Sequence, residues 1–279
     1  MRTIVTITLF LAITLNACRK KNDVGDNPLR NNIGYLLNQI IEGKDTITFQ
    51  YDNSNKLAGL IHAGTSFNYH GIYQFFKYNS TGELVSFMYT YRGSDTLSNS
   101  HNFSYQGDTI IETSINLNAS YGDAIKFFLL NDRIIGTQTG AISNGFLTGF
   151  RDTTHYLYQG DNLIKCVSPF LTSTFQPVDS FLYANSFYNP YSLLQKHVWS
   201  LITGPGRGLA YAESKNIPSI MIYAHYNVIG TTLISSGFSS VKVTSIESAS
   251  ENNLLPKVIK YLAADGSQAI SQYFYQKQK

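Results

Sequence analysis

The sequence is poor in charge and in long apolar runs, and these shortages exclude two classes of protein. Charged residues make up 14% of the 279 residues, against about a quarter in an average globular domain. The formal net charge is +3 and arginines and lysines cluster only at residues 19–21, so no nucleic-acid partner is expected. Beyond the N-terminal segment, no run reaches the roughly 18 apolar residues that a membrane-spanning helix needs.

The sequence also lacks the common motifs of enzymes and metal sites. It contains no His-Glu-x-x-His, no Cys-x-x-Cys and no Gly-x-Ser-x-Gly. The loop from Gly204 to Gly208 lacks the Lys-Ser/Thr of a phosphate-binding loop and is interpreted as a turn-rich loop. We therefore expect no catalytic residue, no metal and no cofactor. The histidines form no spaced ligand pair; they are His62, His70, His101, His155, His197 and His225.

The N-terminus carries the most specific signal in the chain. Arg2 precedes an apolar stretch from Ile4 to Ala17, the length of a signal-peptide core rather than of a membrane span. The stretch ends in Leu15-Asn16-Ala17-Cys18, which resembles the lipobox read by lipoprotein signal peptidase. The resemblance implies that residues 1–17 are a signal peptide and that lipid is attached to Cys18. An ordinary secretory signal with a chance cysteine, or a short uncleaved anchor, is the alternative.

Lipidation of Cys18 would leave Cys166 as the only thiol. An intramolecular disulfide is then impossible. Cys166 falls in Leu163–Val167, an expected strand, so a buried and inert cysteine is favoured over a nucleophile.

A unit of about 27 residues recurs along the chain: aromatic-x-Tyr, a polar turn, then an aliphatic pair. Its tyrosines lie at positions 51, 78, 105 and 158, so the spacings are 27, 27 and 53. A degenerate copy, Phe128-Leu129-Leu130, fills the double gap, and Phe181-Leu182-Tyr183 continues the series. Chance matches in a tyrosine-rich β-protein are the alternative. The clear copies are Phe49-Gln50-Tyr51, Phe76-Lys77-Tyr78, Phe103-Ser104-Tyr105 and Tyr156-Leu157-Tyr158.

The repeat predicts a β-hairpin. Side chains alternate along a strand, so aromatic-x-Tyr places two rings on one face. The Asp, Asn and Gly residues that follow tolerate the positive φ of a tight turn. We expect turns near residues 52–56, 79–82, 106–108, 131–132 and 159–162, and a last one at 264–267.

These copies resemble the Tyr-Asp repeat of Rhs-type proteins. They are more similar still to a group of uncharacterised lipoproteins from Bacteroidota that share the lipobox and the hairpin series. Phe187-Tyr188-Asn189-Pro190-Tyr191 and Ser214-Lys215-Asn216-Ile217-Pro218 match motifs near the C-terminus of that group. The resemblance covers most of residues 33–279 and departs at residues 128–130, where Tyr and Gly are missing. Because its motifs are turns, it implies a fold and carries over no active site.

The predicted organisation is a signal peptide over 1–17, a flexible tether over 18–32 and one repeat-built domain over 33–279. The domain is predicted to be all-β, a single antiparallel meander curled into a half-barrel or an open solenoid. Leu193, Leu194, His197 and Val198 have helix-like spacing, so one short helix is expected over Tyr191–Ser200.

The leading functional hypothesis is a non-enzymatic binding or scaffolding lipoprotein of the outer membrane, facing the periplasm or the cell surface. The lipid on Cys18 would bind the membrane, and the ligand would be a protein, glycan or lipid. An open sheet face carrying Tyr51, Tyr78, Tyr105 and Tyr158 would form its apolar binding patch. If that face is covered, loops such as Gly204–Gly208 would carry the function instead.

Two other classes of function compete with this hypothesis. The first is a carrier whose concave face, lined by Phe75, Phe87 and Met88, holds a hydrophobic or acyl chain. The second is a glycan-active enzyme, which needs paired carboxylates and stacking rings. It is disfavoured because Trp199 is the only tryptophan and the aspartates occupy turn positions of the repeat; these are Asp52, Asp108, Asp132 and Asp161.

Overall fold

The computed structural model describes residues 33–64, 71–91, 99–117, 121–168, 175–194, 197–203, 213–229, 232–250 and 252–279. The expected signal peptide, Cys18, the tether and the Gly204–Gly208 loop lie outside these residues. The described chain is dominated by β-strands, as the repeat predicted. They are β1 (Tyr35–Glu42), β2 (Asp45–Tyr51), β3 (Leu57–Ala63), β4 (Gly71–Tyr78), β5 (Leu84–Tyr91), β6 (Asn99–Gln106), β7 (Thr109–Asn116), β8 (Tyr121–Leu130), β9 (Arg133–Ser143), β10 (Phe146–Gln159), β11 (Asn162–Val167), β12 (Phe175–Leu182), β13 (Ile220–Ile229), β14 (Thr232–Ser248), β15 (Pro256–Ala263) and β16 (Gln268–Lys277).

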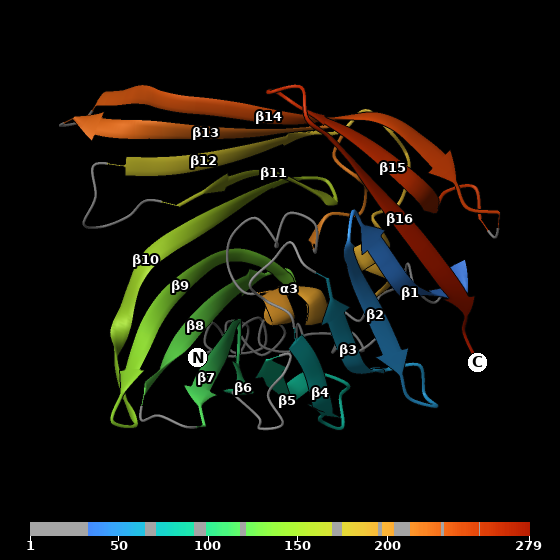
Figure 1. Ribbon diagram of the computed structural model, residues 1–279. Helices are drawn as coiled ribbons and strands as arrows, with labels where there is room; N and C mark the ends of the chain where they lie inside the picture. The colour runs from blue at the N-terminus through green and yellow to red at the C-terminus, as the bar shows by residue number, and fades with distance from the viewer. Residues whose placement is uncertain are drawn as a thin grey trace, which may run out of the picture.

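The strands form one closed antiparallel barrel in which each pairs with its neighbours in sequence (Figure 1). Strand β1 pairs with β16 from Tyr35↔Lys277 to Glu42↔Ser271 and closes the ring. The prediction of a meander is confirmed, and the prediction of a half-barrel or open solenoid is wrong. Closure satisfies the backbone groups that two free edge strands would otherwise expose.

The barrel wall encloses an apolar interior, and its exterior carries charged residues together with exposed apolar ones such as Ile270 and Phe274. Leu57, Leu84, Ile110, Ile134 and Leu163, the aliphatic residues that open the odd-numbered strands, are at most 1% exposed. The outer row carries charge, as in the Lys260–Glu247 ion pair between β15 and β14, at 3.7 Å. This strand alternation places the core inside the ring.

The turns lie where the repeat predicted them. In the 52–56 turn, the Asp52 carboxylate accepts backbone hydrogen bonds from Ser54 and Lys56, both at 2.8 Å. Hydrogen bonds to the charged form lower the pKa of Asp52 although its partial burial opposes the shift. Gly107 and Gly160 adopt φ of 60° and 57°, the left-handed conformation that glycine enters without a Cβ clash.

The repeat tyrosines fasten neighbouring hairpins together. In each copy, the hydroxyl donates to a backbone carbonyl at or near the start of an odd-numbered strand in the preceding hairpin. Tyr78 bonds Leu57 at 2.7 Å, and Tyr158 bonds Ile134 at 2.8 Å. The other bonds are Tyr51 to Leu37, Tyr105 to Leu84, Tyr183 to Leu163 and, on β16, Tyr275 to Pro256. We call these six tyrosines the latch tyrosines.

A segment between β12 and β13 fills one end of the barrel, and its helix α3 (Val198–Thr203) lies inside the ring of strands (Figure 1). Leu194, Val198 and Leu201 join the same core as the strand residues. The prediction of one short helix is confirmed by α3, but its bounds differ from the predicted Tyr191–Ser200. A 3-10 turn, η1 (Pro190–Leu193), comes first, and His197 between the two has φ of 59°. Within the described part of the chain, no helix is both long and apolar enough to cross a membrane.

Candidate ligand cavity

Polar side chains fix the interior segment to the end of the barrel where the odd-numbered strands begin. Ser214 accepts a hydrogen bond from the backbone N–H of Leu163 at 3.0 Å and contacts the Tyr183 hydroxyl at 2.7 Å. Burial raises the pKa of Tyr183 to about 12, so the hydroxyl stays a donor. The backbone N–H of Asn216 donates to the Asn162 side chain at 2.9 Å. These bonds close that end and explain the Ser-Lys-Asn motif as a structural one.

A buried histidine adds a second tie at the same end. Nδ1 of His197 lies 3.1 Å from Oε1 of Glu213, and Nε2 lies 3.7 Å from the carboxylate of Asp132 in the β8–β9 turn. Ser200, on α3, also donates to Glu213. The side chains of His197 and Glu213 are 6% and 8% exposed. Asp132, predicted to be a turn residue only, therefore also faces the interior segment.

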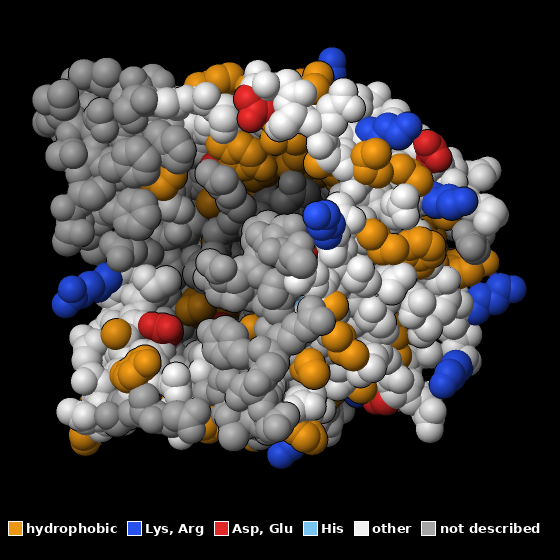
Figure 2. Space-filling model, in the orientation of Figure 1, with side chains coloured by type: hydrophobic (Ala, Val, Ile, Leu, Met, Phe, Trp, Pro, Cys, Tyr) orange, Lys and Arg blue, Asp and Glu red, His pale blue; other side chains and the backbone are white. Residues whose placement is uncertain are grey.

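The rest of the interior contains a cavity of about 800 Å³ between Tyr191 of η1 and the wall built by β13–β16. The turn between β1 and β2, with Glu42 and Asp45, borders it as well. Figure 2 shows the molecule hollowed on the viewed face, with hydrophobic side chains along part of the rim. Ligand pockets in proteins have volumes of about 300–1,000 Å³, so the cavity has room for a small amphiphile.

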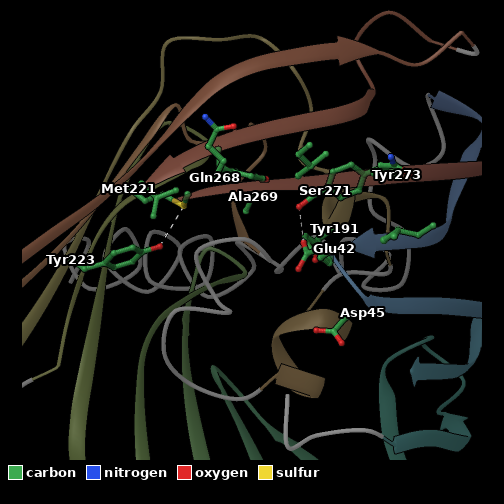
Figure 3. A pocket seen from close by; sticks show the side chains of 15 residues that line it. Glu42, Asp45, Tyr191, Met221, Tyr223, Gln268, Ala269, Ser271 and Tyr273 are labelled. Carbon is green, nitrogen blue, oxygen red and sulfur yellow. Dashed lines mark hydrogen bonds between the residues drawn. The ribbon is translucent and has the colours of Figure 1, made fainter. Parts of the chain in front are cut away.

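The cavity wall combines apolar surface with polar side chains, among them Gln268 and Tyr223 near Met221 and a polar corner around Glu42 and Ser271 (Figure 3). Met221, Val241 and Ala269 supply apolar surface. In the corner, Oγ of Ser271 donates to Oε1 of Glu42 at 3.0 Å. Burial and the neighbouring charge of Asp45 raise the pKa of Glu42, while the Ser271 hydrogen bond opposes the shift.

Two tyrosines complete the polar corner. Tyr273 is 4% exposed, and its hydroxyl shares hydrogen bonds with Tyr261 and Ser271. Burial raises the pKa of both tyrosines well above the ordinary value. Both hydroxyls therefore stay neutral, and Glu42 and Asp45 are the acidic residues of the corner.

A second polar group faces the barrel interior on β6 and β7. Nδ1 of His101 lies 2.8 Å from Oε1 of Glu112, and its Nε2 lies 3.5 Å from Oγ of Ser114. The imidazole stacks on Phe87 with ring centroids 4.3 Å apart. Glu112 is 3% exposed, and burial raises its pKa although the His101 contact opposes the shift. His101 is thus part of an ordered carboxyl–imidazole–hydroxyl series.

The structure does not assemble the binding surfaces that the sequence suggested. The prediction of an open aromatic face is wrong, because its tyrosines pack against the core and bond backbone carbonyls; these are Tyr51, Tyr78, Tyr105 and Tyr158. For the carrier lining, Phe75 is 57% exposed and Phe87 is a fully buried core residue. Neither they nor Met88 lie among the described residues of the cavity wall.

Two other residues have the packing roles that were favoured for them. Trp199 stacks on Tyr191 at 4.6 Å, and Cys166 is buried.

Sequence reasoning missed the cavity residues because their signal is weak. Glu42 and Asp45 flank Gly43-Lys44 in what reads as an ordinary hairpin turn. Ser271 and Tyr273 alternate like any strand pair near the C-terminus. Only the pairing of β1 with β16 brings the two segments together.

Comparisons with known proteins leave the family open. No protein-family model matches the chain, and no curated protein matches it. A solved structure of a porin-like protein from Bacteroides uniformis matches with 10% sequence identity and a TM-score of 0.37, covering 87% of this chain and 96% of that chain. A likeness at this level carries no functional argument, so function is argued from the residues of the barrel.

Proposed function

We propose that this protein is a membrane-anchored, extracytoplasmic binding protein that carries a small amphiphile in its barrel cavity. The cavity of about 800 Å³, whose wall combines apolar and polar side chains, is the observation that supports this function. Burying apolar ligand surface is worth about 25 cal/mol per Å², so such a wall can hold a hydrocarbon chain. The carrier hypothesis is retained with a different lining, and the binding hypothesis is retained without its open tyrosine face.

The anchoring part of the proposal rests on the lipobox ending at Cys18. Acyl chains on that cysteine would hold the protein on the outer membrane, on the periplasmic or the cell-surface side. Two lysines of the outward row favour a barrel that stands in water beside the membrane, and the same row also carries exposed apolar residues such as Leu262 and Ile270. Lys242 and Lys260 lie between inward-facing neighbours on β14 and β15, and a charged residue at mid-wall in lipid costs about 2–4 kcal/mol.

Blocking the cavity tests the carrier function. Ala269 lines the cavity on β16, next to the inward-facing Ser271, so Ala269→Trp should fill it. The neutral dye Nile red should bind the wild type with increased fluorescence and bind Ala269→Trp at least about tenfold more weakly. Ser104→Trp, which adds the same side chain on the exposed outer face of β6, is the matched control. Equal binding by both variants, or no binding by the wild type, would refute the proposal.

A further inference from the structure

The hairpin tips of β7–β10 lie at the end of the barrel opposite the interior segment, which we call the far end (Figure 1, lower left). Because neighbouring strands run antiparallel, every turn from an odd-numbered to an even-numbered strand lies at this end. The turns between β1 and β2 and between β15 and β16 lie there too, and Gly43 and Gln268 beside them border the cavity. The tips therefore share an end of the barrel with the cavity.

The β9–β10 hairpin extends past β11 and ends in exposed aromatic rings. Pairing of β10 with β11 begins at His155, whereas pairing of β10 with β9 continues to Phe146↔Ser143. Ser143 also pairs with Tyr121, the first residue of β8. Tyr121, Ser143 and Phe146 thus form one row across three strands. Tyr121 and Phe146 are 62% and 77% exposed, so both rings stand in solvent.

The adjacent row faces the other side of these strands and is apolar as well. Side chains alternate along a strand, so Leu147 and its partner Ile142 lie on the face opposite the rings. The row continues through Gly122 to Ile115. Leu147 and Ile115 are 49% and 38% exposed. A hairpin in water needs apolar residues only on its core-facing side, whereas apolar side chains exposed on both faces suit a tip that enters an apolar phase.

The membrane that would hold the lipid anchor is an apolar phase within reach of the tips. The expected tether, residues 18–32, leads to the end of the barrel where β1 begins. At about 3.3–3.6 Å per residue it reaches about 50 Å. The 11 residues of β9 span about 36 Å, so the tether is long enough for the far end to meet the same membrane. The sequence carries no charged residue from Ile134 to Phe150, so insertion of the β9–β10 tip buries no charge.

We propose that the tips of β7–β10 insert into the interface of the bilayer to which the protein is anchored, through Tyr121, Phe146 and Leu147. Tyrosine is enriched at membrane–water interfaces. This inference rests on the proposed lipid anchor and deepens the carrier function. It places the cavity end of the barrel against the bilayer, from which an amphiphile would enter.

Quenching by brominated lipid tests the contact at matched positions. Tyr121 and Leu130 are the two ends of β8 and are 62% and 59% exposed. Tyr121→Trp, Phe146→Trp and the control Leu130→Trp are purified as the lipidated protein and placed in phosphatidylcholine vesicles with or without dibrominated acyl chains. The wild type supplies the background of Trp199. Bromination should lower the added fluorescence of the two tip variants at least about twofold, because interfacial segments lie about 5–10 Å deep at the acyl boundary. Leu130→Trp should show no added quenching.

Each outcome decides one claim. Quenching of Leu130→Trp as strong as that of the tip variants, or quenching of none of them, overturns the docking and leaves the carrier function standing. If mass spectrometry finds no acyl chain on Cys18, the proposed anchor fails. A maleimide lipid coupled to that thiol then supplies the anchor, since Cys166 is buried, and the same three variants decide the docking. Should circular dichroism show that a tip variant is unfolded, Leu147→Trp takes its place.

Discussion

Removal of one latch hydroxyl should measurably destabilise the barrel. Tyr158→Phe deletes the 2.8 Å hydrogen bond to the carbonyl of Ile134, a residue that is 0% exposed. The ring still fills its space, so the cost is the lost bond plus a carbonyl left unsatisfied in the core. Such a change costs about 1–3 kcal/mol. At about 2–4 °C per kcal/mol for a domain of this size, Tm should fall by about 2–12 °C.

Thermal unfolding followed by far-ultraviolet circular dichroism measures this shift. Tyr121→Phe is the control because Tyr121 is 62% exposed, and its Tm should stay within about 1–2 °C of the wild type. Burial raises the pKa of Tyr158 far above its ordinary value, so the latch contributes fully at lower pH and is lost only at strongly alkaline pH. The Tm difference should therefore be equal at pH 6 and pH 8. A shift no larger than that of Tyr121→Phe would show that the latch bond is not a source of stability.

Four further predictions concern the anchor, the interior segment, the carboxyls and catalysis. Cys18→Ala should abolish incorporation of radiolabelled palmitate and leave an unprocessed precursor; a wild type that takes up no label would disprove the lipobox assignment. Glu213→Ala removes the partner of His197 and Ser200, and breaking a buried pair costs about 3–5 kcal/mol. Urea unfolding should show this loss in the free energy of unfolding, and a smaller loss for Glu213→Gln. Equal stability of Glu213→Ala and the wild type would contradict this prediction. The pKa of Glu42 is raised above 4.5 in the folded state, so its contribution to stability is present below about pH 4 and is lost as the pH rises through the folded pKa. The Tm of Glu42→Gln minus the Tm of the wild type should therefore be more positive at pH 7 than at pH 4. A less positive difference at pH 7 would refute this sign. The protein should hydrolyse no p-nitrophenyl ester, and fluorophosphonate should not label Ser114. The reason is that the Ser114 hydroxyl lies 3.5 Å from His101 and that burial favours the neutral form of Glu112. Labelling of Ser114 that is lost in His101→Ala would contradict this prediction.

The hairpins could be predicted from the sequence because their determinants are local. Asp52 and the backbone groups that it binds are within four residues of one another. The position of Gly107 follows from the conformational freedom of glycine, and the inward rings follow from strand alternation. These relations hold in any sheet, open or closed, so they predicted the turns without predicting the barrel.

Closure depends on pairing between the two ends of the domain, and no local pattern encodes it. Tyr35 and Lys277 are neighbours in the sheet although nearly the whole domain separates them in sequence. The cavity has the same origin, since Glu42 and Ser271 meet only across this seam. The interior segment added a second difficulty. Its Val198 and Leu201 pack against strand residues from many hairpins, so the apolar positions indicated a helix without indicating that the barrel surrounds it.

The irregular copy of the repeat differs from the regular copies in its contacts. In the regular copies a tyrosine near the end of the even-numbered strand bonds a carbonyl in the preceding hairpin, but on β8 the corresponding inward position, paired with Ile134, is Leu129. This copy therefore lacks the latch. The following turn instead brings Asp132, at φ of 63°, to 3.7 Å from Nε2 of His197 on the interior segment. The turn of the hairpin that lacks a latch thus contacts the interior segment through a charged group. The β10–β11 turn, whose copy keeps its latch, does the same, because Asp161 lies 3.9 Å from Nζ of Lys215. Contact with the interior segment is therefore compatible with either form of the repeat.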